Sequence, residues 1–239
     1  MSTLLEIRNL YGGYEEGVDI LQGIDMSVAQ GEAVGIIGLN GSGKSTLGKA
    51  VMNLIPYRRG TIVFDGEDVS SLTTYDLAQK GMAMMHQGGV VFPNLSVWEN
   101  LSMAFGPKTD RTYYEKLEAI IPLLKQPRKK LMHTHADTLS GGQRHELALA
   151  MTLARHPRLV ILDEPSAGLS PAAVEEMYGM LGEIQKEFEN SILLIEQNIN
   201  QTAEFCQRCL IIKQGSVANI MVASSAIEIE RFVFESDRR

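Results

Sequence analysis

The sequence predicts one α/β domain in which a largely parallel sheet is covered by helices and a helical segment is inserted near the middle. Two observations predict this class. Short apolar runs bounded by glycine or polar residues recur along the chain, and amphipathic helical patterns lie between them. Strands that alternate with helices form parallel sheets that are buried on both faces. A length of 239 residues suits one such domain.

The predicted strands are apolar runs of strand length. They are residues 33–37, 61–64, 159–162, 192–195 and 210–212. Two helical faces are predicted from apolar residues spaced three and four apart. One comprises Leu47, Ala50, Val51 and Leu54, and the other comprises Leu147, Ala150, Met151 and Ala154. The first helix follows the first strand, and the second helix precedes the third strand.

Residues 88–157 contain no convincing strand and predict a helical insertion. No repeat, low-complexity stretch or linker divides the chain. We therefore expect a single domain, 1–239, with an α/β lobe of about 1–87 and 158–239 and a helical lobe of about 88–157.

Composition argues against some functions. The net charge is −7, which argues against a general nucleic-acid binder, so no nucleic-acid partner is expected. We interpret two basic clusters, residues 58–59 and 125–130, as solvated faces. Cys206 and Cys209 are spaced as C-x-x-C, but no second Cys or His pair lies nearby to complete a four-ligand zinc site. We interpret these cysteines as small packing residues.

The chain contains no apolar run of the roughly 18 residues that a transmembrane helix needs. The first ten residues carry Glu6 and Arg8 in a strand-like pattern and have no apolar signal region. We therefore expect the protein to stay on the cytosolic side, with any membrane contact made through a partner.

A phosphate-binding loop is predicted at residues 38–45, which fit G-x-x-x-x-G-K-[ST] between a buried strand and an amphipathic helix. Glycines let backbone N–H groups turn toward phosphates, and the helix N-terminus adds its positive end. Lys44 can reach the β- and γ-phosphates, and the Ser45 hydroxyl can bind Mg²⁺. The candidate ATP-binding residues are Gly38, Asn40, Gly41, Ser42, Gly43, Lys44, Ser45 and Thr46.

Two carboxylates follow the apolar run 159–162, where ligands of parallel sheets bind. Asp163 is the expected Mg²⁺ partner. Glu164 can point at the water that attacks the γ-phosphate, and hydrolysis needs a general base within hydrogen-bond reach of that water. An alternative is that Asp163 and Glu164 only mark the start of a helix.

A second glycine-rich helix start, Leu139-Ser140-Gly141-Gly142-Gln143, is a further anion-site candidate. Together these motifs resemble the ATP-binding-cassette (ABC) ATPases over about residues 4–217. The resemblance implies a P-loop NTPase cassette with an antiparallel N-terminal β part and a helical subdomain. It also implies that two subunits pack head to tail, so that Ser140, Gly141 and Gly142 contact the γ-phosphate of ATP bound to a partner subunit.

The same resemblance assigns further residues. Tyr14 matches the aromatic residue that stacks on adenine, with Tyr11 as the alternative and a strand-end tyrosine without this role also open. Gln87 matches the glutamine that approaches Mg²⁺ and the attacking water, on a loop that senses the transmembrane partner. Gln197 occupies the switch position that contacts the γ-phosphate, where most members carry His.

Two departures indicate a subgroup. Ser170 stands where many members carry Asp, and Gln197 stands where most carry His. Both, together with the residues around Gln87, resemble the ATPases of importers for branched-chain amino acids and of related importers for urea or amides. In that subgroup the ATPase often works beside a second, different ATPase subunit, so the expected pair is a homodimer or a heterodimer.

The sequence therefore predicts the ATP-hydrolysing subunit of an ABC importer, peripheral on the cytoplasmic face of the cell membrane. Its expected partners are transmembrane permease subunits, a second ATPase subunit and, indirectly, a solute-binding protein. The alternative is a soluble ABC ATPase in cluster assembly or another role outside transport. A small-molecule kinase is a third possibility, but it leaves residues 139–143 and Asp163-Glu164 unexplained.

Overall fold

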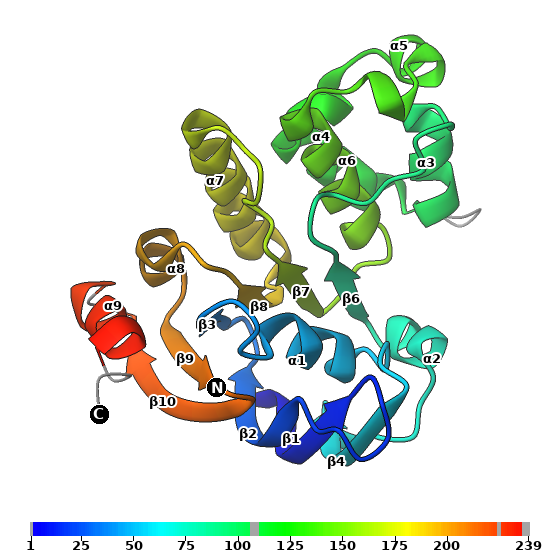
Figure 1. Cartoon of the computed structure of the whole chain (residues 1–239). Coiled ribbons are helices and arrows are strands. Elements are labelled where there is room, and N and C mark those ends of the chain that lie inside the picture. Colours follow the sequence, from blue (N-terminus) through cyan, green and yellow to red (C-terminus); the bar gives the residue numbers. More distant parts are fainter. Residues whose placement is uncertain (1, 106–109, 224–225, 236–239) are drawn as a thin grey trace.

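A six-stranded sheet forms the centre of the molecule, which we describe from a computed structural model covering residues 2–105, 110–223 and 226–235 (Figure 1). Its strands are β3 (Ala33–Ile37), β6 (Met82–Met85), β7 (Leu159–Asp163), β8 (Ser191–Ile195), β9 (Arg208–Lys213) and β10 (Ser216–Val222), in the order β10-β9-β3-β8-β7-β6. All neighbours pair in parallel except β10, which is antiparallel to β9. The predicted fold class, a mainly parallel α/β core, is confirmed.

A second, four-stranded sheet lies against this core. It consists of β1 (Thr3–Gly13), β2 (Leu21–Ala29), β4 (Tyr57–Phe64) and β5 (Glu67–Asp68), in the order β2-β1-β4-β5, and every pair is antiparallel. The strand predicted at 61–64 is the end of β4, so it belongs to this sheet and not to the parallel core. Burial alternates there, with Ile62 and Phe64 buried between more exposed neighbours, as a strand with one covered face requires.

Helices cover the sheet and form a separate group at one end of the molecule. The helices are α1 (Lys44–Val51), α2 (Thr74–Gln79), α3 (Val97–Phe105), α4 (Arg111–Ile120), α5 (Arg128–His133), α6 (Gly141–Leu153), α7 (Pro171–Phe188), α8 (Ile199–Phe205) and α9 (Ala226–Glu235), with the 3₁₀ turns η1 (Pro122–Lys125) and η2 (Ala136–Thr138). Figure 1 shows α3 to α6 in green at one end and β1 and β2 in blue at the other. Within the described part of the predicted insertion, strand pairing is limited to a single bridge between Ser96 and His135.

Two apolar cores lie on opposite faces of the six-stranded sheet. Successive residues of β7 point to opposite faces, so Leu159 and Ile161 pack in one core while Val160 and Leu162 pack in the other. The first core also contains α1 and the antiparallel sheet, and the second contains α6, α7 and the helical group. Such two-sided burial explains why the core strands read as continuous apolar runs.

The predicted apolar face of the first helix is wrong at its last residue, Leu54. Leu47, Ala50 and Val51 are buried, but α1 ends at Val51 and Leu54 lies beyond it with 41% of its surface exposed. Asn53 adopts a left-handed conformation, with φ of 54°, which is typical of a residue just past a helix C-terminus. The spacing of apolar residues could not reveal this turn.

The prediction that residues 58–59 form a solvated face is wrong for Arg58. Arg58 is half-buried and donates hydrogen bonds to the carbonyl of Ala50 and, at 2.9 Å, to that of Ser70. Its burial lowers the pKa of its guanidinium. Arg59 is exposed as expected and forms an ion pair with Asp19. Arg58 therefore secures the C-terminal end of α1, where carbonyls need donors.

The two cysteines are buried and unbridged. Cys206 follows α8, and Cys209 lies within β9. Burial raises the pKa of both thiols, that of Cys209 to about 12, so neither is a thiolate near neutral pH. Their environment matches the packing role expected from the sequence.

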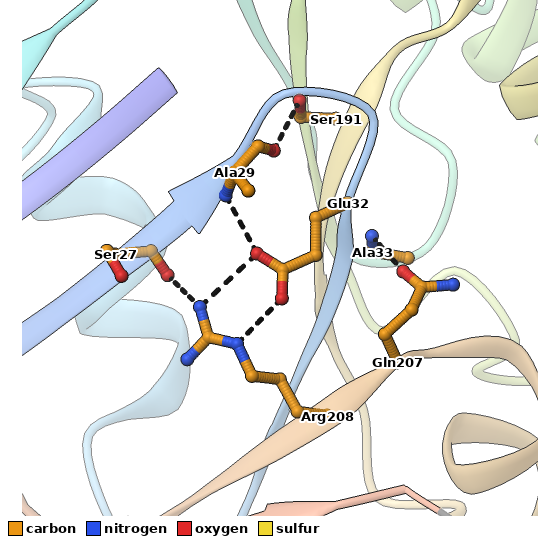
Figure 2. A network of polar contacts seen from close by, with 7 residues as sticks. All are labelled: Ser27, Ala29, Glu32, Ala33, Ser191, Gln207 and Arg208. Carbon is orange, nitrogen blue, oxygen red and sulfur yellow. Dashed lines mark hydrogen bonds and ion pairs between the residues drawn. The ribbon is translucent and has the colours of Figure 1, made fainter. Parts of the chain in front are cut away.

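A polar network joins the two sheets where the chain turns from β2 into β3 (Figure 2). The Glu32 carboxylate accepts hydrogen bonds from the Arg208 Nε and from the Ala29 N–H, both at 2.7 Å. Arg208 also donates to the Ser27 carbonyl, and the Ser191 hydroxyl donates to the Ala29 carbonyl at 3.1 Å. Because Glu32 lies in the turn and its partners belong to β2 and β9, with Ser191 of β8 also bonded to β2, the network holds the antiparallel sheet against the start of the core strands.

Candidate nucleotide site

The phosphate loop joins the end of β3 to the start of α1, and its glycines are required by geometry. A Cβ on Gly38 would lie 2.3 Å from the Ile212 carbonyl oxygen, so only glycine fits against β9. Gly41 and Gly43 have φ values of 78° and 104°, which other residues rarely adopt. The loop therefore curls tightly over the N-terminus of α1, as the sequence motif predicts.

Lys44 is buried inside this loop, with 5% of its surface exposed. Its Nζ donates to the carbonyls of Gly38 at 2.8 Å and Leu39 at 3.1 Å. Burial lowers the pKa of Lys44, while the nearby carboxylates of Glu164 and Asp163 act in the opposite direction. The two carbonyls are neutral acceptors. A bound phosphate would give the Lys44 ammonium an anionic acceptor, which forms a stronger hydrogen bond.

The other loop residues also fit an anionic ligand. The Ser42 Oγ is buried without a hydrogen-bond partner in the described chain, and it would lie 2.7 Å from a Cβ on Gly38, which places it inside the loop. Thr46 is buried at the start of α1, and Asn40 is exposed on the loop. The unpaired Ser42 hydroxyl and the Lys44 ammonium are both hydrogen-bond donors, and a phosphate could accept from both.

Ser45 and Asp163 meet across the site, as a shared Mg²⁺ ion would require. The Ser45 Oγ donates to the Asp163 Oδ1 at 2.8 Å. Asp163 is 3% exposed, and burial raises its pKa although the Ser45 hydrogen bond opposes that shift. A hydroxyl and a carboxylate are the hard oxygen ligands that Mg²⁺ accepts while it keeps several waters. The pair therefore fits the ion.

Glu164 lies one residue further, with its carboxylate held by two glutamines. The Gln87 Nε2 donates to one carboxylate oxygen and the Gln197 Nε2 to the other, each at 2.5 Å. The Glu164 backbone is left-handed, with φ of 48°, and its N–H donates to the Ile195 carbonyl at 2.8 Å. The structure thus brings together three predicted residues from the carboxyl ends of β6, β7 and β8.

Glu196 is a site residue that the sequence reasoning did not select. It is 2% exposed and accepts hydrogen bonds from the backbone N–H groups of Ser166 and Gln197, each at 3.0 Å. It therefore ties the loop after Glu164 to the loop after β8. The sequence signal that could have identified Glu196 is an acidic residue directly after the apolar run 192–195.

The glycine-rich start of α6 is exposed, and its hydrogen bonds stay within that helix. The Ser140 Oγ accepts from the Gln143 N–H at 3.2 Å, and the Gln143 side chain accepts from the Ser140 N–H at the same distance. Ser140 and Gly141 are exposed, and Gly142 is half-buried. Ser170, the residue that departs from the family pattern, caps α7 by accepting from the Ala173 N–H.

The two candidate adenine-stacking tyrosines differ in environment. Tyr14 is 47% exposed, and the Lys49 Nζ from α1 lies 5.9 Å from its ring centroid. Tyr11 lies within β1, and the Arg59 guanidinium covers its ring at 3.8 Å. One face of Tyr11 is therefore already stacked, which favours Tyr14 as the platform for a base.

Comparison with known proteins places this geometry in a family. The family described as ABC transporter matches residues 21–167. The probable branched-chain amino acid transport ATP-binding protein LivF of Archaeoglobus fulgidus is 32% identical over 96% of both chains. The lipopolysaccharide export system ATP-binding protein LptB of Haemophilus influenzae is 29% identical over 90% of this chain and 89% of that protein.

Solved structures agree. The chain is similar to cbiO1 of Clostridium perfringens, part of the ABC transporter complex cbiONQ, with a TM-score of 0.81 and 26% identity over 100% of this chain and 96% of that one. The cassette MJ0796, solved as a dimer bound to ADP and Pi, gives a TM-score of 0.79 at 21% identity over 93% of this chain and 100% of that one, and shows the same fold. The chain belongs to the ABC transporter family, as one of its ATP-hydrolysing cassettes.

Proposed function

We propose that this chain binds ATP at the loop around Lys44, hydrolyses it with Glu164 as general base, and thereby drives an importer through permease partners. The observation that carries the proposal is the convergence of Lys44, the Ser45–Asp163 pair and Glu164 at the ends of β3 and β7. Lysine, hydroxyl and paired carboxylates are the groups that phosphoryl transfer to water requires.

The position of each residue in the site sets its proposed role. Lys44 and the N–H groups at the start of α1 bind the phosphates, and Ser45, Asp163 and Gln87 would hold Mg²⁺. The bound ion would neutralise charge on the phosphate oxygens. Glu164 takes the proton of the attacking water, and Ser140, Gly141 and Gly142 of a second ATPase subunit close the site from the opposite side. Tyr14 stacks on the adenine.

The permease docks beside Gln87. A pocket of about 280 Å³ lies between the loop after β6 and helices α3 and α6. It is lined by Met84, Met85, His86, Val90, Val91, Phe92, Ala104, Ala148, Met151 and Thr152. Val90 is 65% exposed and Phe92 is 47% exposed, on the loop that begins with Gln87. An exposed apolar rim around a pocket is typical of a protein contact, and a contact here would act directly on the catalytic site.

The membrane assignment rests on such partners. Among the described helices, none combines the length and the apolar character needed to cross a bilayer. We place the chain on the cytoplasmic face of the membrane, where ATP is available, as a peripheral subunit. The two lobes expected at 1–87 with 158–239 and at 88–157 act in this scheme as the nucleotide-binding and permease-facing parts.

The proposed cargo is a branched-chain amino acid or a related small polar solute such as urea or an amide. The similarity to LivF and the departures at Ser170 and Gln197 support this assignment. Export of a lipopolysaccharide is the second candidate, favoured by the 29% identity to LptB. A solute-binding protein is expected only in the first case.

Transport assays in cells separate these functions. We expect deletion of the gene to abolish uptake of labelled leucine or urea, and the wild-type gene to restore it, whereas a Lys44→Ala gene does not. Normal uptake with loss of lipopolysaccharide from the cell surface would favour the second candidate. ATP hydrolysis without co-purification of any polytopic membrane protein would contradict both.

A further inference from the structure

A pocket of about 340 Å³ lies before the first residues of β7 and β8, at the ends of these strands opposite the nucleotide site. Its lining comes from the loop before β7, from the end of α7 and the loop that follows it, and from α4. The residues that matter here are Tyr113, His156, Arg158, Phe188, Glu189 and Asn190. The volume lies in the range of small-molecule sites. None of these residues belongs to the nucleotide site.

One buried acceptor in the lining of this pocket lacks a donor. Asn190 is 3% exposed. Its Nδ2 donates to the Pro157 carbonyl, which directs the Oδ1 of the same amide away from that carbonyl. This Oδ1 has no hydrogen-bond partner among the described residues. Buried amide oxygens are normally paired, because an unpaired one costs free energy. A ligand that donates an N–H to Asn190 would satisfy it.

Three rings form one side of the pocket. The Tyr113 ring stacks on His156, with centroids 3.4 Å apart, and lies tilted against Phe188 at 4.5 Å. The Tyr113 hydroxyl already donates to the Leu153 carbonyl at 2.9 Å, so this residue offers its ring and not its hydroxyl. Burial lowers the pKa of His156, although Asp110 opposes that shift, so the imidazole is neutral near neutral pH. Aromatic faces of this kind attract cations.

The charge around the pocket also favours a cation. The pocket lies at the C-terminal end of α7, where backbone carbonyls carry partial negative charge. Two charged lining residues already have partners, since Glu187 pairs with Lys116 at 2.7 Å and Arg158 pairs with Asp65. Glu189 is exposed and has no ionic partner in the described part of the chain. Its carboxylate is therefore free to bind a positive group.

We propose that this pocket binds a small guanidinium compound, whose N–H groups donate to the Asn190 Oδ1 and to the Glu189 carboxylate while its plane lies against the aromatic rings. A guanidinium suits these residues because it is planar, always charged and rich in N–H donors, and because it stacks on aromatic faces. The site is independent of the proposed function, since binding here requires neither ATP nor a partner subunit.

A ligand in this pocket would connect two parts of the molecule. Tyr113 belongs to α4 in the green helical group of Figure 1, whereas Glu189 and Asn190 follow α7. The Lys116–Glu187 ion pair already crosses between α4 and α7. A bound ligand would add contacts on both sides and, because it binds only the folded chain, should raise the Tm.

Two matched compounds test the site. Butylguanidinium and butylurea have the same planar shape, but only the first is charged. In the full chain labelled with ¹⁵N-asparagine, butylguanidinium should shift the side-chain amide signal of Asn190 saturably. It should not shift the signal of Asn53, whose amide donates to the Leu72 carbonyl outside the pocket. Butylurea should bind about tenfold more weakly, because it lacks the charge that Glu189 and the rings attract.

The same titration followed by Tm should show a rise with butylguanidinium that exceeds the rise with butylurea. Equal affinities for the two compounds would overturn the proposal, because the site would then not select a cation. The absence of a saturable Asn190 shift up to about 10 mM butylguanidinium would also overturn it.

Variants at the rim assign the contacts. Glu189→Asn removes the carboxylate and suits the left-handed backbone at this position, where φ is 52°. We expect it to weaken butylguanidinium binding about threefold, as the loss of an exposed charge contact does. Phe188→Leu keeps an apolar side chain without a ring and should weaken binding by a similar factor. Glu183→Gln, on the exposed face of α7 outside the pocket, is the matched control and should leave the affinity unchanged.

The Tm of each variant without ligand shows whether it is folded. Wild-type affinity in a folded Glu189→Asn or Phe188→Leu protein would overturn the proposed contacts. An equal loss of affinity in Glu183→Gln would do the same, since the effect would then come from the general charge of α7 and not from the pocket.

Discussion

Removal of the Glu32 carboxylate should destabilise the fold because it dismantles the network between the two sheets. In Glu32→Ala the half-buried Arg208 loses its ionic partner and the Ala29 N–H loses its acceptor. Breaking a fully buried ion pair costs about 3–5 kcal/mol. The two side chains are 13% and 23% exposed, so solvent screening lowers the expected cost to about 2 kcal/mol.

Urea unfolding measures this cost. With an m-value of about 3 kcal/mol per molar urea for a chain of this size, the midpoint should fall by roughly 0.7 M. Glu6→Ala is the matched control, since the exposed Glu6–Arg8 pair should leave the midpoint unchanged. Equal midpoints for the two variants would refute the view that the network joins the sheets.

The same pair predicts a pH dependence. Burial alone would raise the pKa of Glu32, but the hydrogen bonds and charge of Arg208, with the Ala29 N–H, bring it below its ordinary value. A carboxyl with a lowered folded pKa stabilises the fold above its unfolded pKa of about 4.3, and this stability is lost as the pH falls through the folded value. Glu32→Gln should therefore lose less free energy of unfolding than wild type between about pH 5 and acid.

Three further predictions concern the site. Lys44→Ala should abolish tight ATP binding, because a direct charge contact to phosphate is lost; unchanged affinity and turnover would contradict the loop assignment. Glu164→Gln should bind Mg-ATP while turnover falls by roughly 10²–10⁴-fold, and light scattering should then detect an accumulated ATP-bound dimer; a monomer both alone and with its partner subunit would argue against a sandwiched nucleotide. Ser140→Arg mixed with Lys44→Ala should recover part of the hydrolysis that each lacks alone, measured by phosphate release, and no recovery in demonstrated mixed dimers would argue against a shared site.

Periodicity predicted four strands of the core sheet, β3, β7, β8 and β9, because burial on both faces leaves a continuous apolar signal. The fifth predicted run is the end of β4, which is covered on one face only. β10 was not predicted, because its burial alternates at the sheet edge and Ile220 and Val222 are exposed. α2 was also missed, although Thr73 and Asp76 form a capping box at its start.

In the site, the residues could be predicted from the sequence but some of their contacts could not. The motifs located Lys44, Ser45, Asp163 and Glu164, because each pair stands in a short local pattern, at a helix start or at the end of an apolar run. The hydrogen bonds from Gln87 and Gln197 to Glu164 could not be predicted, because they depend on β7 lying between β6 and β8. Strand order is a property of the folded sheet and leaves no local pattern in the sequence.

Helix capping explains how the two glycine-rich helix starts differ. Both offer N–H groups to an anion, and the sequence did not rank them. At α1 the capping position is Gly43, and no side chain in the described structure caps this helix. The first N–H groups of α1 can therefore donate to a bound anion. At α6 Ser140 and Gln143 form a complete capping box. Because the Gln143 N–H already donates to the Ser140 Oγ, a phosphate at this helix start finds one free N–H group fewer than at α1, although the Ser140 O–H can still donate to it. ATP should therefore bind first at α1, and the α6 start of a second subunit should engage only once that ATP presents its γ-phosphate.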